Sequence, residues 1–167
     1  MFKYCKQNLK EIENLILSLS REEYSYKSHY LTHASIGQHV RHILEFYQCL
    51  FRGIETGFVN YDKRVRDIQL EIDTAFTAEV IEKICTIDPI VNYEVEIFLE
   101  GNFSVEGNES AYIKTSLNRE LAYCLEHSIH HQALIKISLL EQNLTQLIDN
   151  NFGVAPATIR FKEVCAH

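Results

Sequence analysis

The chain has 167 residues, of which 46% are hydrophobic and 23% are charged, and its formal net charge at neutral pH is -7. This composition excludes a disordered chain, and the length fits one domain with its own core, so we expect residues 1–167 to form a single domain. The negative charge, with few clustered basic residues, argues against nucleic acid as a partner.

The sequence also argues against association with a membrane. No apolar run approaches the roughly 20 residues that span a bilayer, and the N-terminal segment is too polar for a signal peptide. We therefore expect a cytoplasmic protein. The five cysteines form no CxxC pair, which indicates reduced thiols, most of them small core residues.

The first predicted element is an amphipathic helix over residues 4–19, where apolar side chains recur at steps of three and four. A polar and aromatic connection, residues 20–34, leads to Ser35-Ile36-Gly37-Gln38. This is a capping box, in which the Ser35 hydroxyl accepts from the backbone N–H of Gln38 and the Gln38 side chain reaches back. A second helix is therefore predicted to begin there.

The second helix is predicted to run to about Glu55. When residues are advanced by about 100° each, His39 and His42 fall on or beside its apolar side. The opposite, polar side carries Gln38, Arg41, Glu45, Gln48, Arg52 and Glu55.

The rest of the chain is predicted to hold two more helices and a hairpin. Residues 56–73 break the helical pattern and are expected to form a long connection, followed by a shorter helix over 77–87. Alternating apolar residues over 93–115 predict a β-hairpin. A last long helix is expected over 116–147, and the tail after it carries apolar anchors, which predict a packed arm.

The last helix contains an HxxxH motif formed by His127 and His131. Residues four apart lie on one face of a helix, and two such imidazoles can share one metal ion with a third ligand from elsewhere. His42 or His39 can supply that third ligand. Three histidines leave coordination positions open for water or substrate, as in catalytic sites.

The segments SIGQHVRHILEF and LEHSIHHQALI resemble the DinB-like (DinB/YfiT) family of bacterial four-helix-bundle proteins. The family pattern has a histidine seven residues after a serine at a helix start, here His42 after Ser35, and a late HxxxH, here His127 and His131. The resemblance selects His42 over His39 as the third metal ligand.

The resemblance implies an all-α four-helix bundle of up-down-down-up order, with a long crossover between its second and third helices, here residues 56–73. It implies a divalent metal, nickel or zinc first and manganese or iron second, and often a homodimer. Some members transfer small thiols onto electrophiles, so the implied partner is a small-molecule thiol or electrophile.

The chain departs from the family pattern in two places. Many members follow the last histidine with Arg-Gly-Gln, whereas His131 is followed by Gln132-Ala133-Leu134. The predicted hairpin before the last helix is an insertion into the bundle. The sequence therefore predicts the metal ligands but designates no catalytic residue.

Several other residues have two interpretations. His130 either has a structural role or contacts a metal-binding histidine without binding the metal itself. Glu120 is either a core residue or a residue that orients an imidazole. Cys49 and Cys124 are core residues or thiolate ligands. The carboxylates Glu94 and Glu96 are expected on a solvated face, and the segment NYDKRVRD is an ion-paired loop or an anion patch.

Three functions compete on these grounds. The first is a metal-dependent enzyme of the DinB-like type, a thiol S-transferase or a hydrolase. The second is a non-catalytic metal-binding or stress-response module with the same helices. The third is a helical dimerisation protein whose histidines are buried and uncharged.

Overall fold

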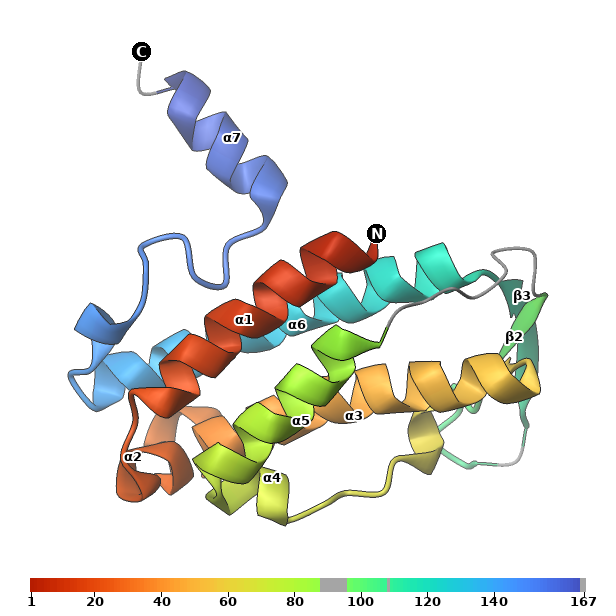
Figure 1. Cartoon of the computed structure of the whole chain (residues 1–167), viewed down its shortest axis with the longest axis horizontal. Coiled ribbons are helices and arrows are strands. Elements are labelled where there is room, and N and C mark those ends of the chain that lie inside the picture. Colours follow the sequence, from red (N-terminus) through yellow and green to blue (C-terminus); the bar gives the residue numbers. More distant parts are fainter. Residues whose placement is uncertain (88–95, 108, 166–167) are drawn as a thin grey trace.

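The computed structural model describes residues 1–87, 96–107 and 109–165, and it is mostly helical with a small three-stranded sheet (Figure 1). The helices are α1 (Phe2–Leu17), α2 (Arg21–Ser25), α3 (Ile36–Thr56), α4 (Gln69–Ile72), α5 (Thr74–Thr86), α6 (Leu117–Glu141) and α7 (Pro156–Cys165). The strands are β1 (Phe58–Val59), β2 (Ile97–Gly101) and β3 (Ala111–Thr115). Three 3-10 helices complete the order: η1 (His29–Leu31), η2 (Tyr61–Lys63) and η3 (Thr145–Leu147).

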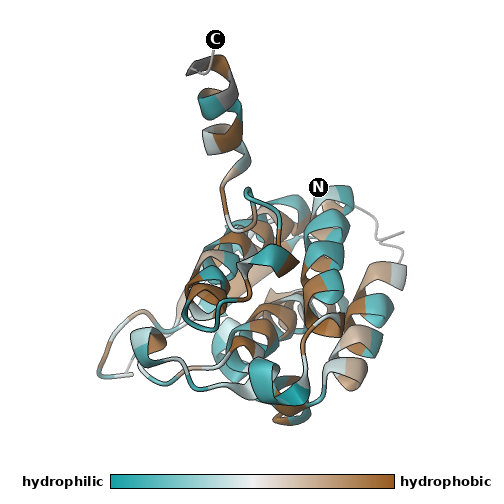
Figure 2. Ribbon diagram, turned by 90° about the vertical axis from the view of Figure 1, so that its left-hand side faces the viewer, coloured by the Kyte–Doolittle hydropathy of each residue, from teal (hydrophilic) through white to brown (hydrophobic). Residues whose placement is uncertain are grey.

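Four helices, α1, α3, α5 and α6, lie side by side and enclose the core (Figure 1). Helix α3 packs against α6, and α1 packs against both α5 and α6. The hydrophobic residues of these helices lie mainly on the sides that face one another, as the colouring of the ribbon shows (Figure 2). Within the described residues, no helix is both long enough and apolar enough to cross a bilayer.

The capping box predicted at the start of α3 is confirmed. The Gln38 N–H donates to the Ser35 hydroxyl, and the Ser35 N–H donates to the Gln38 side chain, both over 3.1 Å. Helix α3 ends at Gly57, whose φ of 77° is the left-handed conformation that glycine adopts without strain. Both ends of this helix are therefore set by local sequence signals.

One residue on the predicted polar side of α3 is buried, contrary to expectation. Glu45 is 1% exposed because the segment after β1 packs over this side of the helix. Its carboxylate accepts from the Asp67 N–H over 2.9 Å and lies 3.8 Å from the Nε atoms of both Arg41 and Arg64. Helical periodicity alone could not reveal this cover.

The predicted hairpin is confirmed for its described residues, but the all-α expectation is too simple. Strands β2 and β3 are antiparallel, with Ile97 opposite Thr115 and Gly101 opposite Ala111. Strand β1 pairs in parallel with β2, although it was expected to be part of a connection. Residues 93–95, where the hairpin was predicted to start, lie outside the described residues.

Gly53 allows β1 to lie against the end of α3. A side-chain Cβ at this position would be 2.7 Å from the Phe58 carbonyl oxygen, which is closer than atoms tolerate. The missing side chain therefore fixes where the small sheet meets the helices.

The last long helix ends earlier than predicted, at Glu141 rather than near residue 147. Asn143 takes a left-handed φ of 57°, and the Leu144 N–H donates back to the Leu139 carbonyl over 2.8 Å. Such a backward bond is typical of a helix end.

The tail is a packed arm only in its first half. Phe152 is buried, and Gly153 lies directly against the backbone of α6. Helix α7 then stands away from the other helices (Figures 1 and 2), with Phe161 and Val164 exposed. The prediction is therefore wrong for the last described segment.

Candidate metal centre

The contact between α3 and α6 brings three of the predicted histidines together. Each of His42, His127 and His131 offers one ring nitrogen to a group whose members all lie within 4.8 Å of one another. The Nε2 atoms of His42 and His127 are 2.8 Å apart. All three side chains are half-buried, so they are shielded from bulk water yet reachable.

The spacing of these nitrogens fits a shared metal ion. Imidazole nitrogens bind Zn²⁺ at about 2.0 to 2.1 Å, so two of them would be about 3.3 Å apart around a tetrahedral ion and about 2.9 Å apart at the right angle of an octahedral or square-planar ion. The 2.8 Å between His42 and His127 is nearer to the right-angled separation and about 0.5 Å short of the tetrahedral one. The group can therefore hold a metal ion.

The protonation state of these imidazoles also suits metal binding, which requires a neutral nitrogen. Burial first, and then the neighbouring imidazoles, lower the pKa of His42 to about 4 and that of His131 to about 3. Burial also lowers the pKa of His127. The rings are therefore uncharged at neutral pH, with lone pairs free to bind a cation.

His39, the rival third ligand, lies behind the group and contacts His131. Its Nδ1 atom is 2.9 Å from the Nδ1 atom of His131, which leaves Nε2 of His131 for the group. Its own Nε2 atom is buried and has no hydrogen-bond partner. His39 is therefore positioned to orient the imidazole of His131.

His130 stays outside the group. Its side chain is exposed, and its ring centre is 5.4 Å from that of His131. The structural interpretation of His130 fits this position.

Aromatic rings pack against the histidine group, chiefly against His127. Phe46 stacks on His127 with ring centres 4.4 Å apart, and Tyr123 stacks on it at 5.7 Å. Phe46 also stacks on Tyr61 at 4.7 Å. No sequence motif singled out these rings, although Phe46 lies four residues after His42 and Tyr123 lies four residues before His127.

The same rings line a cavity next to the histidines. Its volume is about 340 Å³, and Phe46, Tyr61 and Tyr123 form an aromatic wall. Arg64 lies 5.1 Å from the centre of the Phe46 ring, and Arg119 is a further cation at the cavity. A molecule in this cavity would lie one ring away from the histidine group.

Glu120 supports the aromatic wall and does not orient an imidazole, so that alternative is wrong. Its buried carboxylate accepts from the Tyr61 hydroxyl over 2.7 Å and from the Thr115 hydroxyl over 2.6 Å. Burial, with the nearby Cys124 and Glu120, raises the pKa of Tyr61 well above its usual range. Tyr61 therefore remains a neutral donor.

The cysteines beside the histidines are core residues. Cys124 is 1% exposed, its sulfur lies 3.7 Å from the Tyr61 hydroxyl, and burial raises the pKa of its thiol. Cys5, Cys49 and Cys85 are likewise free and buried. The core interpretation is confirmed for these four.

The segment NYDKRVRD is an ion-paired loop, which was one of its two interpretations. Its pairs are formed with glutamates from elsewhere: Lys63 with Glu100 over 3.0 Å, and Arg64 with Glu45. Glu96 is exposed and pairs with Lys114, whereas Glu94 lies outside the described residues.

Comparison with known proteins adds one partial match. No family model and no solved structure matches the chain. Over 105 residues, 61% of this chain, the sequence is 34% identical to "FK506-binding protein 5" of Rhizopus delemar. The match covers 27% of that longer protein, so the chain spans about a quarter of the relative's length. The fold and the site therefore define the class of this protein: it is a mostly helical protein with a three-histidine group that can hold a metal ion.

Proposed function

We propose that the chain is a divalent-metal-dependent enzyme of the DinB-like type, either a thiol S-transferase or a hydrolase. The observation that carries the proposal is the convergence of His42, His127 and His131 from two helices, with their nitrogens within 4.8 Å. The resemblance around these residues favours nickel or zinc, with manganese or iron as the next candidates.

The fold is proposed to be the DinB-like four-helix bundle in up-down-down-up order. The four helices α1, α3, α5 and α6, which lie side by side, would be its members, and the segment from β1 to α4 would be its long crossover. The sheet formed by β1, β2 and β3 would be an addition to that bundle. A homodimer is proposed on the resemblance alone.

A divalent ion held by three protein ligands keeps open positions and lowers the pKa of a bound water or thiol. The chain's own residues would bind the ion, orient its ligands and bind the substrate. His42, His127 and His131 would bind the ion, and His39 would accept the Nδ1 proton of His131 and fix its ring. The aromatic cavity beside His127 would receive the apolar part of a substrate and exclude water from it.

The first test is metal content and metal-dependent stability. Untagged protein purified without chelator should contain close to one ion per chain by elemental mass spectrometry, and nickel, zinc or manganese should raise the melting temperature of stripped protein. His131→Ala should abolish both effects, whereas His130→Ala, which alters the exposed neighbour, should preserve them. Protein with far less than one ion and no thermal response to any of the three metals would refute the proposal.

The second test separates turnover from binding. The metal-loaded protein should conjugate a small thiol to an electrophile, or hydrolyse an ester or amide, and the activity should disappear in the His131→Ala variant. Metal binding without turnover over a panel of thiols and electrophiles would instead support a non-catalytic metal-binding or stress-response module. The position of Gln132 favours this second candidate, because the residue after the last histidine is buried between α1 and α6 in a structural network.

A further inference from the structure

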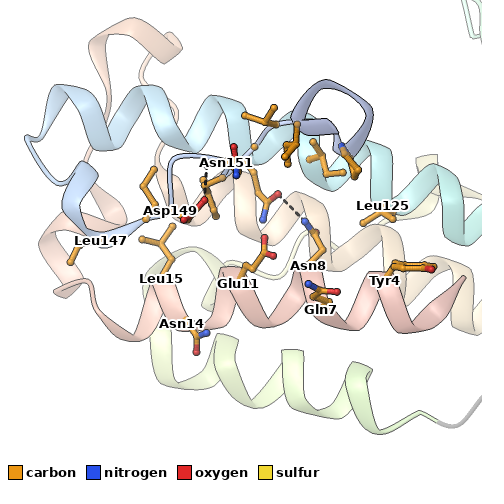
Figure 3. A pocket seen from close by; sticks show the side chains of 18 residues that line it. Tyr4, Gln7, Asn8, Glu11, Asn14, Leu15, Leu125, Leu147, Asp149 and Asn151 are labelled. Atoms are coloured by element: carbon orange, nitrogen blue, oxygen red, sulfur yellow. Dashed lines mark hydrogen bonds between the residues drawn. The ribbon is translucent and has the colours of Figure 1, made fainter. Parts of the chain in front are cut away.

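A second cavity lies on the opposite side of α6 from the histidines. It has a volume of about 440 Å³ and is enclosed by α1, α6 and residues 147–159 (Figure 3). Leu125, Ile129 and Gln132 form its α6 wall. At about 100° per residue these three lie on the face of α6 opposite to His127 and His131. The cavity is therefore separate from the candidate metal centre.

A buried polar network fixes one wall of this cavity. The Ser128 hydroxyl donates to the Asn8 side-chain oxygen over 2.5 Å. The Asn8 amide donates to the Gln132 side-chain oxygen over 2.8 Å, and this bond is drawn as a dashed line in Figure 3. All three side chains are buried, Gln132 to 1% exposure. The network therefore occupies the oxygen of Gln132 and leaves its NH₂ group as the free end.

Among the described residues, that NH₂ group has no partner within hydrogen-bond distance, and the Glu11 carboxylate is its neighbour in the cavity. An unmade hydrogen bond of a buried amide is unfavourable, and such groups in native proteins call for a specific explanation. Because Gln132 lines the cavity, an acceptor oxygen on a bound molecule would satisfy this donor.

The charge of the cavity is negative. Glu11 and Asp149 line it, and no lysine or arginine is among its lining residues. Neither carboxylate belongs to an ion pair within the described parts of the chain. Partial burial raises the pKa of Glu11, the nearby Gln132 amide lowers it, and the charge of Asp149 raises it, with a net upward shift. A cation between these carboxylates would relieve their repulsion.

The remaining walls are apolar. They are formed by Leu15, Leu125, Ile129, Leu147, Ile148, Phe152, Val154 and Ile159. The cavity size is typical of a small-molecule site with a few polar groups on an apolar lining.

We infer that this cavity binds a small organic ammonium compound that carries a neighbouring carbonyl group and an apolar body, such as the amide or ester of an apolar α-amino acid. The ammonium group would pair with Glu11 and Asp149, and the carbonyl oxygen would accept from the Gln132 NH₂. The apolar body would lie among the aliphatic side chains and Phe152.

The test uses L-phenylalaninamide as the probe, at a pH below the usual α-amino pKa of about 7.7 to 8.0. Titration followed by amide NMR should give saturable shifts at the lining residues. Two comparison compounds should bind at least about tenfold more weakly: 3-phenylpropanamide, which lacks the ammonium group, and glycinamide, which lacks the apolar body.

Variants assign the binding to this cavity. Glu11→Gln should weaken binding of L-phenylalaninamide by about tenfold, whereas Glu126→Gln, at an exposed carboxylate on α6 outside the cavity, should leave it unchanged. Gln132→Met should also weaken binding, but this variant changes a buried residue and can alter folding. Glu11 is exposed, so Glu11→Gln should not affect folding, and its result is the decisive one.

Three results would overturn the inference. The first is no saturable shift with L-phenylalaninamide, L-leucinamide or phenethylamine at about 5 mM, a concentration that detects dissociation constants in the millimolar range. The second is equally strong binding of 3-phenylpropanamide, and the third is unchanged binding in Glu11→Gln. Binding should be the same in metal-stripped protein, so the outcome is independent of the proposed metal enzyme.

Discussion

His131 shows how packing prepares a side chain for chemistry. Its ring lies between those of His42, His127 and His39, with ring centres 4.5, 4.6 and 5.1 Å away. Adding a proton here would place a charge in a half-buried site among other imidazoles, so burial and these neighbours lower the pKa of His131 to about 3. The same packing that makes protonation unfavourable keeps a lone pair available to a cation.

The lowered pKa values predict the acid sensitivity of metal-free protein. His42 and His131 have folded pKa values of about 4 and about 3, below the ordinary 6.5 that they regain on unfolding. The unfolded chain therefore binds more protons below pH 6.5, and the free energy of unfolding should fall as pH decreases from about 6.5 toward 4. The loss should be on the order of 2 to 4 kcal/mol.

Urea unfolding of chelator-treated protein at several pH values measures this slope. His131→Gln removes one titrating group and should flatten the curve between about pH 6.5 and 4. His29→Gln, at an exposed histidine in η1, is the control and should keep the wild-type slope. A stability that rises on acidification over this range would contradict the prediction.

Glu45 and Glu55 form a second matched pair, because both lie on the predicted polar side of α3 but only Glu45 is buried. Glu45→Ala would leave the guanidinium groups of Arg41 and Arg64 without their buried partner and free the Asp67 N–H. We expect it to lower the free energy of unfolding by about 3 kcal/mol, measured by chemical denaturation. Glu55→Ala should change stability by less than about 0.5 kcal/mol; equal effects would refute the role of burial.

At the scale of elements, the pairing of α3 with α6 determines the site. The histidines at positions 39 and 42 lie in the first two turns of α3, so the start of this helix fixes where their rings meet those of α6. The capping box at Ser35 is therefore both a helix signal and a positioning device for the site.

Replacing the cap tests this link. Ser35→Ala should lower the free energy of unfolding by about 1 kcal/mol, because the Gln38 N–H loses its acceptor. Ser35→Asp keeps an acceptor at the same position and should retain nearly all of the stability. If the alanine variant were as stable as the aspartate variant, the capping box would contribute nothing measurable.

At the scale of the whole molecule, the histidine group connects segments that are far apart in the chain. His42 and His127 are separated by 85 positions, yet their Nε2 atoms are 2.8 Å apart. This group forms only when the chain is folded, so an ion would bind the folded chain and not the unfolded one. Binding would therefore stabilise the whole chain against unfolding.

The size of that stabilisation can be measured. At a free metal concentration of about 100 times Kd, nickel or zinc should raise the free energy of unfolding by about 2.7 kcal/mol. The gain should disappear in His42→Ala but persist in His29→Ala, which alters an exposed histidine in η1. A similar gain in both variants would show that the metal binds elsewhere.

The sequence by itself determined the local features of this protein. Helix periodicity, the Ser35 cap and the HxxxH step depend on residues within about four positions of one another, so the main helices, the hairpin and the pair of His127 and His131 could be predicted. The choice of His42 as their partner came from the family resemblance, because no local pattern links it to the last helix. Tertiary structure alone decided the burial of Glu45 and Gln132, the pairing of β1 with β2 and the stacking of Tyr61 on Phe46. These features depend on which distant segment covers a given face, and no pattern within a single helix or strand records its neighbour.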